Sequence, residues 1–352
     1  MDLYAGLDVG LNETSICLVD REGKTIREWK IATDPAGAAE ALAPYAAELR
    51  RVGVEASSLG LWLYRGLHDQ GLPMVMAEAR HMSVSLSTMR NKTDRNDARG
   101  IAQMMRLGWF RAVHVKNVET QKLATLLTQR KFLNRKLIDL ENHIRGALRA
   151  YGMLIGPVGR KGYDGRVREL IAHTDYVFIR LIESMLDVRA AVLEGYDRLH
   201  RILLQVVQHD GVCRRLMTVP GVGPVTALAF KVGVDDPHRF RRSRTVAAHF
   251  GLTPRHIQSG TIDIEGRISK RGDRMVREAL CEAAASLLNR VKRYSALRAW
   301  GQRIAKRKGA MCAIVAMARK LAGILHRMWI AEADFEPLRG AKITQKLKLK
   351  PA

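Results

Sequence analysis

The chain has 352 residues, of which 47% are hydrophobic and 27% are charged. This is long enough for two packed domains, and the composition excludes a disordered chain. Lysine and arginine outnumber aspartate and glutamate by 59 to 35, which gives a formal net charge of +24. Because so cationic a surface attracts polyanions, we expect nucleic acid as the partner.

The sequence also argues against several other classes of protein. Its four cysteines are scattered without a C-x-x-C pair, so neither a zinc ribbon nor a disulfide framework is expected, and the compartment should be reducing. No apolar run reaches the length of a membrane span, and the first residues lack the pattern of a signal peptide. We therefore expect a cytoplasmic, nucleoid-associated protein with no membrane partner.

Residues 1–115 are predicted to form an α/β domain. Three β-rich runs come first, with "REGK" as a hairpin connection between the last two, and helices and strands then alternate. The expected order is β-β-β-α-β-α-β-α, read from "LYAGLDVG", "TSICLVD", "TIREWKIAT", "DPAGAAEALAPYAAELRR", "VGVEA", "SSLGLWLYRGLHDQG", "LPMVMAEA" and "KTDRNDARGIAQMMRLG".

Four carboxylates of this domain stand at positions that could converge. Asp8 ends the first strand and Glu55 ends the first strand after a helix, while Asp94 and Asp97 share one face of the last helix. Like charges gather only around a counter-ion, so convergence predicts hard divalent cations, most plausibly two Mg²⁺ ions about 3.5–4 Å apart that support phosphodiester cleavage. Taken singly, each carboxylate could instead be a turn residue, a strand-end charge or part of a helix cap.

The opening stretch has a second interpretation. "GLDVGLNETSICLVD" is similar to the first phosphate loop of sugar kinases and actin-like ATPases, in which Asp8 would orient Mg²⁺-ATP. Those kinases need a second phosphate loop and an adenosine loop, both rich in glycine, and the sequence offers no convincing candidate for either. Their substrates also do not call for so large a positive charge.

Residues 116–206 are predicted to form an antiparallel coiled-coil hairpin. Apolar positions recur at alternating steps of three and four over two long runs, separated by "YGMLIGPVGRKGYDG". The hairpin could be a spacer within one chain, or it could join copies into a dimer or tetramer. We favour the homo-oligomer, because so long a hairpin has seam surface to cover.

Residues 207–335 are predicted to form a mostly helical domain, followed by a basic tail over 336–352. In "LMTVPGVGPVTALAFKVG", a turn with Gly221 and Gly223 joins two helices and resembles a helix-hairpin-helix, which holds a nucleic-acid phosphate with backbone N–H groups. A plain connection between helices is the alternative. The basic residues expected to bind nucleic acid are Arg241, Arg242, Arg244, Arg267, Lys270, Arg271 and Arg274.

Ser259 lies in a Q-S-G turn between these two groups of basic residues. Among closely spaced guanidinium groups, an exposed hydroxyl could attack a phosphodiester. On physical grounds alone the assignment is open, since Ser243 and Ser269 are alternatives. His256 is expected to contact phosphate or backbone rather than to act as a general base.

Six motifs in this order resemble one family, the bacterial insertion-sequence transposases of the D-E-D-D type. They are "GLDVG", "VGVEAS", "NKTDRNDA", "PGVGPVTA", "FGLTPRHIQSG" and "GRISKRGDRMVREAL", and together they cover nearly the whole chain. The resemblance implies a RuvC-like N-terminal domain of the RNase H fold, joined by a coiled coil to a serine-bearing C-terminal domain.

The resemblance also implies roles for particular residues. It places metal ligation on Asp8, Glu55, Asp94 and Asp97, and it makes Ser259 a nucleophile that forms a transient phosphoserine link with DNA. It further implies DNA partners at the element ends and target, a composite site shared between subunits, and a structured non-coding guide RNA. A hydrolytic Mg²⁺-dependent nuclease such as a junction resolvase is the main alternative, and a purely architectural nucleic-acid-binding protein is another.

Overall fold

The computed structural model describes residues 1–87, 91, 93–260 and 262–338. Most of the basic tail predicted at 336–352 therefore lies outside the described residues. The chain divides into two compact units, residues 1–116 and 117–352. Along the described part of the chain, no helix combines the length and the apolar character needed to cross a membrane.

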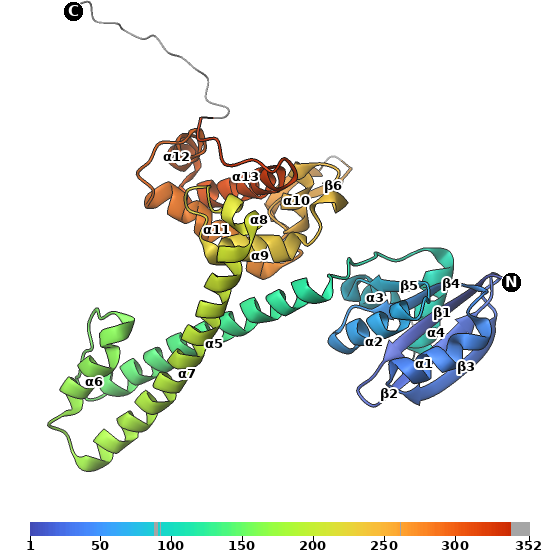
Figure 1. Ribbon diagram of the computed structural model, residues 1–352, viewed down its shortest axis with the longest axis horizontal. Coiled ribbons are helices and arrows are strands. Elements are labelled where there is room, and N and C mark those ends of the chain that lie inside the picture. The colour runs from blue at the N-terminus through green and yellow to red at the C-terminus, as the bar shows by residue number, and fades with distance from the viewer. Residues whose placement is uncertain (88–90, 92, 261, 339–352) are drawn as a thin grey trace, which may run out of the picture. The chain divides into compact units, whose positions relative to one another are not determined.

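The first unit is built on a five-stranded mixed sheet with the strand order β3-β2-β1-β4-β5. The first three strands pair antiparallel, and β4 and β5 run parallel to β1 (Figure 1). The strands are β1 Leu3–Val9, β2 Glu13–Val19, β3 Thr25–Ala32, β4 Leu49–Glu55 and β5 Met74–Ala77. The helices are α1 Pro35–Leu42, the 3₁₀ helix η1 Ala43–Tyr45, α2 Ser58–Asp69, α3 Ala79–Leu86 and α4 Asp94–Leu107.

This topology confirms the RuvC-like, RNase H-type fold expected for the N-terminal domain. The predicted strands and main helices form, but the helix expected over 34–51 ends at Leu42 with η1 after it, and its last residues from Leu49 belong to β4. The structure also adds the short helix α3 between β5 and α4. One face of the sheet packs its alternate apolar residues, such as Leu7 and Val54, against Leu63 and Leu67 of α2. The opposite face is covered by α4, through contacts such as Ala98 and Ala102 against Cys17 of β2.

Two glycines let α4 lie directly on the sheet. A Cβ at Gly6 of β1 would come within 2.3 Å of the backbone nitrogen of Ala102, and one at Gly53 of β4 would come within 2.5 Å of the Met105 side chain. The helix begins where the Thr93 hydroxyl accepts a hydrogen bond from the Asn96 backbone and ends at the left-handed Gly108. The close packing fixes the first turn of α4 relative to β1.

The second unit starts with the predicted antiparallel pair of long helices, α5 Val118–Arg149 and α7 Tyr176–His209. Near their connection lie the 3₁₀ helix η2 Arg160–Gly162 and the helix α6 Tyr163–Ile171 (Figure 1). Arg189 of α7 is fully buried and pairs at 2.7 Å with both Glu141 of α5 and Asp164 of α6. An arginine thus occupies a seam position, with two carboxylates to offset its charge.

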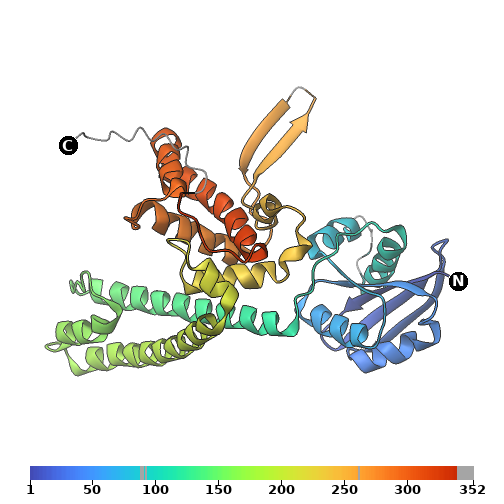
Figure 2. The ribbon, with the colours of Figure 1, turned by 45° about the horizontal axis from the view of Figure 1, so that its top comes forward.

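The rest of the second unit is mostly helical, as predicted. Its core is formed chiefly by α9, α11 and α13. The elements are α8 Gly211–Leu216, α9 Pro224–Val234, η3 Pro237–Arg239, α10 Ser243–His249, β6 Pro254–Ser259, β7 Ile262–Ile268, α11 Arg274–Asn289, α12 Ala296–Lys308 and α13 Ala310–Ile330. The hairpin β6–β7 was not predicted, and Figure 2 shows it standing out from the helices of its unit.

Candidate active-site carboxylates, serine hairpin and relatives

The first two predicted carboxylates lie at the carboxyl ends of adjacent parallel strands. The β1–β4 register pairs Gly6 with Gly53 and Leu7 with Val54, so Asp8 and Glu55 follow as the next neighbours at one edge of the sheet. Side chains alternate between the faces of a strand, and the Gly6 and Gly53 positions face α4. Asp8 and Glu55 are therefore on the α4 side, where both are half-buried.

The other two carboxylates come from the first turn of α4. Ala98 packs against Gly6, which places the preceding turn toward the edge that carries Asp8. Asp94 is exposed and Asp97 is half-buried. The pKa of Lys30 on β3 is raised, chiefly by its hydrogen bond and ion pair with Glu13, with a smaller contribution from the charge of Asp94. This places Asp94 within electrostatic reach of β3.

All four residues lie toward the carboxyl ends of β1 and β4, on the face of the sheet that α4 covers. Their side chains are not arranged as a complete set of metal ligands. Across the described residues, no group of three or more His, Cys, Asp or Glu side chains is arranged to hold a metal ion. The donor chemistry nevertheless fits a hard divalent cation, since all four groups are carboxylates and neither a sulfur nor an imidazole donor is among them. Four carboxylates also repel one another when no cation offsets their charge.

A residue that the sequence analysis missed fastens the first turns of α4. Glu28 of β3 accepts hydrogen bonds from Arg95 Nε at 2.6 Å and from Arg99 Nη2 at 2.8 Å. Burial raises the pKa of Glu28, but the two arginines outweigh burial and leave that pKa below its usual value. Because Arg95 lies between Asp94 and Asp97 in the chain, Glu28 is a positioning residue for the carboxylate edge. The signal in the sequence was that Glu28 is the one acidic residue of a strand that also carries Arg27 and Lys30.

Ser259 lies at the tip of the β6–β7 hairpin. It is the last residue of β6, it pairs with position 262 across the hairpin, and every residue of β6 is exposed. Gly260, the next residue, has a φ of 56°, in the left-handed region that glycine adopts without strain. The His256 Nε2 atom lies 3.0 Å from the Asp263 Oδ1 atom across the hairpin.

The expected cluster of guanidinium groups around Ser259 is not found within the described residues. Arg267 lies five residues along β7 from the partner of Ser259, about 17 Å away at about 3.3 Å per residue. Lys270 and Arg271 lie beyond it at the base of the hairpin, and Arg274 pairs with Glu278 at 2.6 Å. The sequence "TIDIEGRI" alternates apolar and polar residues, so period-two patterning was the signal that would have predicted this separation.

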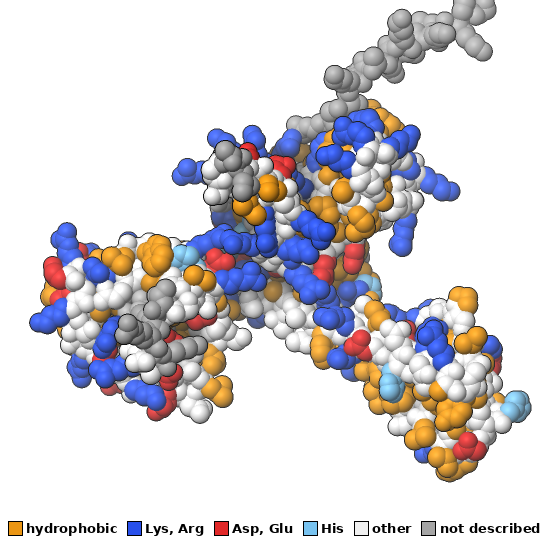
Figure 3. All heavy atoms as spheres, turned by 180° about the vertical axis from the view of Figure 1, so that it is seen from behind, with side chains coloured by type: hydrophobic (Ala, Val, Ile, Leu, Met, Phe, Trp, Pro, Cys, Tyr) orange, Lys and Arg blue, Asp and Glu red, His pale blue; other side chains and the backbone are white. Residues whose placement is uncertain are grey.

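The remaining basic residues predicted to bind nucleic acid lie around α10. Arg241 and Arg242 are exposed just before this helix, and Arg244 is exposed in its first turn. Figure 3 shows many Lys and Arg side chains over the C-terminal unit.

The turn between α8 and α9 has the predicted order of helix, turn and helix. Its two glycines differ in their surroundings. Gly221 has a φ of 90°, and a Cβ there would lie 2.7 Å from the backbone oxygen of Ala283. This residue is therefore a packing glycine against α11. Gly223 precedes Pro224 at the start of α9 and would have open space around a Cβ. Of the two glycines, only Gly223 has open space where a side chain would stand.

Comparison with known proteins gives consistent matches along the chain. A family model described as "Transposase IS116/IS110/IS902 family" matches residues 213–300, and a model for D-E-D-D transposases, described as "Transposase", matches residues 5–153. The transposase for insertion sequence element IS1111A of Coxiella burnetii is 30% identical over 325 residues, which cover 91% of this chain and 87% of that protein.

Other matches cover smaller shares of the chain. A probable family 20 transposase of Pseudomonas aeruginosa is 29% identical over 70% of this chain and 75% of its own length. The pilin gene-inverting protein of Moraxella bovis is 28% identical over 66% of this chain and 64% of its own. A structure titled "Thermus thermophilus RuvC structure" aligns with 32% of this chain and 99% of its own at 15% identity and a TM-score of 0.26. The chain belongs to the family of bacterial insertion-sequence transposases of the D-E-D-D type, which are enzymes that act on DNA.

Proposed function

We propose that this transposase cuts and rejoins DNA with a carboxylate edge in its first unit and a serine nucleophile in its second. Asp8, Glu55, Asp94 and Asp97 would hold Mg²⁺, and Ser259 would attack the phosphodiester. The observation that supports the first part is the placement of Asp8 and Glu55 side by side in strand register, beneath the helix whose first turn holds the other two carboxylates. The exposed tip of the hairpin supports the second part.

Transposases of this type generally use divalent metal ions, and the oxygen-rich donor set here makes Mg²⁺ the ion we propose. When bound, Mg²⁺ supplies positive charge that offsets the negative charge on the oxygens of the reacting phosphate. The four carboxylates would hold the ion at a fixed place, because β1, β4 and α4 are packed together through Gly6 and Gly53. Glu28 keeps the first turns of α4 in position through Arg95 and Arg99.

In the proposed cleavage step, Ser259 Oγ attacks the phosphorus atom. A serine–phosphate ester bond forms, the bond from phosphorus to the 3′ oxygen breaks, and the serine proton passes through solvent to the departing 3′ oxygen. Strand joining is the reverse attack by a 3′-OH on the phosphoserine, so the bond energy is retained and no ATP is consumed. Within the hairpin itself, the acids near Ser259 are few and exposed, so the carboxylate edge must reach it from the first unit of the same copy or of another.

Assembly into a dimer or tetramer through the α5–α7 hairpin is part of the proposal. Large apolar side chains stand exposed along these helices, among them Phe132, Ile138, Leu181, Val188 and Ile202. Exposed apolar side chains that recur along a helical pair favour association with another copy. The charge of +24 supports binding of DNA together with a guide non-coding RNA.

An adduct assay tests the chemistry. Purified protein, the RNA transcribed from the end of its own element and a labelled duplex spanning that end are incubated with Mg²⁺, and a denaturing gel separates protein–DNA adducts from cleaved strands. We expect an adduct with the wild type and none with Ser259→Ala, while Ser269→Ala serves as the matched control. Adduct formation by Ser259→Ala would reject the serine assignment. Cleavage by Ser259→Ala without an adduct would instead identify a hydrolytic nuclease.

A further inference from the structure

The second unit contains a groove of about 1060 Å³ that the sequence analysis did not anticipate. One wall is formed by α10 and the base of the β6–β7 hairpin, and the other is formed by α12 and α13. The floor between them is apolar and is made of side chains such as Leu252, Ile268, Ile304, Val315 and Ile324. All of these walls belong to the one compact unit 117–352.

The rims of this groove carry charge of one sign. Among its described lining residues, eight are Lys or Arg and none is Asp or Glu. Arg244, Arg267 and Lys270 come from the wall with the hairpin, and Arg307, Lys308 and Arg319 come from α12 and α13. None of these six forms an ion pair with an acidic residue in the described part of the chain. Facing rows of unpaired cations repel each other and are stabilised by a bound polyanion.

The two walls are joined by a buried histidine. His326 of α13 is fully buried, and its Nε2 lies 2.8 Å from the Pro237 backbone oxygen while its Nδ1 lies 3.0 Å from Ser243 Oγ at the start of α10. The Pro237 oxygen can only accept, so Nε2 carries the hydrogen and the Ser243 hydroxyl donates to Nδ1. These two hydrogen bonds tie α13 to η3 and to the start of α10, and α10 and α13 stand on opposite walls of the groove.

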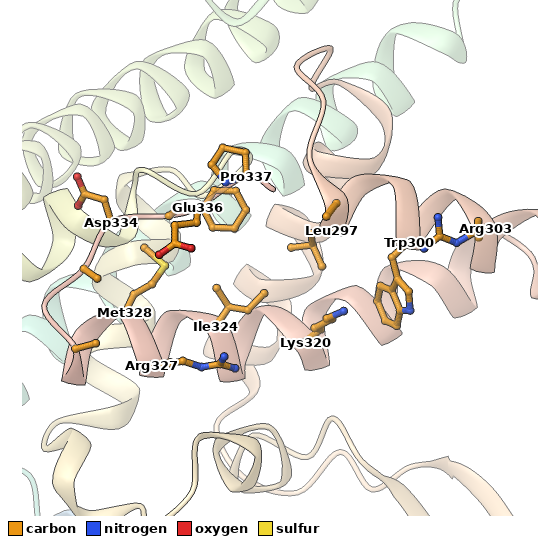
Figure 4. Close-up of a pocket in the computed structure, with 14 residues that line it drawn as sticks. Leu297, Trp300, Arg303, Lys320, Ile324, Arg327, Met328, Asp334, Glu336 and Pro337 are labelled. Carbon is orange, nitrogen blue, oxygen red and sulfur yellow. The ribbon is translucent and has the colours of Figure 1, made fainter. Parts of the chain in front are cut away.

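A smaller pocket of about 300 Å³ adjoins the groove and limits where phosphates can lie. Both cavities share Trp300, Lys320, Ile324 and Arg327. Figure 4 shows Asp334 and Glu336 on the far side of this pocket, on the segment that follows α13. The negative charge of these two acids disfavours a phosphate group beside them. A bound polyanion should therefore follow the groove and turn away before it reaches the pocket.

We propose that this groove binds a single-stranded segment of nucleic acid, with its bases on the apolar floor and its phosphates along the two basic rims. A duplex keeps its bases stacked inside and would leave the floor without a partner, whereas a single strand can place bases on apolar surface and phosphates beside cations. The proposal rests on the proposed function to the extent that the strand belongs to the nucleic acid with which the transposase works. The proposal adds basic residues of α12 and α13 to those of α10 and β7 that the sequence predicts to bind nucleic acid.

The test compares two triple variants of the full chain that each remove three positive charges. Arg307→Gln/Lys308→Gln/Arg319→Gln alters the groove. Arg290→Gln/Lys292→Gln/Arg293→Gln alters exposed residues of the same unit that do not line it. Binding of fluorescent dT12 and rU12 is followed by anisotropy from low to high salt, with a 12-base-pair duplex as the second probe. The two single strands distinguish DNA from RNA as the source of the segment.

We expect the groove variant to bind at least one single strand about tenfold more weakly and to lose about 2 units of salt slope, since each neutralised phosphate contributes about 0.7 for single strands. The control variant should stay within about twofold of wild type. Equal losses for duplex and single strand would show general surface attraction and overturn the proposal, as would unchanged binding. Binding is measured with Ser259→Ala protein as well, so failure of the groove is distinguishable from failure of the serine chemistry.

A crosslinking measurement completes the test independently of the variants. Photoactivated rU12 carrying 4-thiouridine is crosslinked to the wild-type protein, and the attached peptides are identified by mass spectrometry. The proposal expects crosslinks in β7, α12 or α13, near residues such as Ile268, Ile304 or Val315. Crosslinks confined to other elements would contradict it even if the affinity of the groove variant fell.

Discussion

The two proposed catalytic elements of this transposase are built in opposite ways. The carboxylate edge is part of a packed sheet, with an apolar core on one face and α4 pressed against glycines on the other. The serine is carried by a two-stranded hairpin whose first strand is exposed throughout. An isolated hairpin is only marginally stable in water, so Ser259 is presented on a movable support and the carboxylates on a rigid one. Rigid metal ligands and a mobile nucleophile, as proposed here, would suit a reaction in which one serine must meet DNA held elsewhere.

The largest effect is expected from a substitution that pushes α4 away from the sheet. In Gly6→Ala, the new Cβ would lie 2.3 Å from the backbone of Ala98 and Ala102, which cannot move aside as a flexible side chain can. We expect the first unit to lose about 3–5 kcal/mol of stability, measured by denaturant unfolding. Gly37→Ala is the matched control, because its Cβ would meet nothing closer than 3.8 Å. A mild effect at Gly6 would mean that α4 does not rest on the sheet as described.

The next effect separates chemistry from folding. Asp97→Asn removes a charge from the first turn of α4 and changes few contacts, so strand cleavage should fall by about 10²-fold or more while the unfolding midpoint barely moves. The rate is followed on the labelled duplex across a range of Mg²⁺ concentrations. Asp69→Asn, at the exposed end of α2, is the control and should cleave normally. Cleavage by Asp97→Asn at the wild-type rate would remove Asp97 from the metal ligands.

A smaller effect is expected where α4 is fastened to β3. Glu28→Gln keeps the shape of the side chain but weakens its bonds to Arg95 and Arg99, at a cost of about 1 kcal/mol. Because the folded state lowers the pKa of Glu28, its contribution is present at neutral pH and is lost as the pH falls below the ordinary value of 4.5. Unfolding of wild type and variant should therefore converge in acid. A constant difference at every pH would contradict the ionic origin of the bond.

The contrast between the two elements also explains what the sequence could reveal. Strands with apolar runs, a capped helix and glycine stops predict the first unit well, and the positions of Asp8 and Glu55 follow from strand ends alone. Glu28 was missed because its partners lie on α4, far along the chain, and no local pattern links them. The hairpin was not predicted because the alternation of apolar and polar residues in "TIDIEGRI" is short and lies within a segment rich in charged residues. The groove could not be predicted, since one wall comes from residues 243–270 and the other from residues 300–327, and the two meet only through tertiary packing.

The smallest effect is expected from a substitution in the β6–β7 hairpin, which tests directly whether the hairpin is mobile. Ile257 of β6 is 57% exposed, whereas Val54 of β4 is fully buried. Ile257→Thr should therefore change stability by less than about 0.5 kcal/mol, while Val54→Thr should cost about 1–3 kcal/mol because it places a hydroxyl in the sheet core. Hydrogen exchange gives the companion measurement, with rapid exchange expected for β6 amides and slow exchange for β1. A large loss of stability in Ile257→Thr, or strong protection of β6, would show that the hairpin is packed in solution and that Ser259 is held as firmly as the carboxylates.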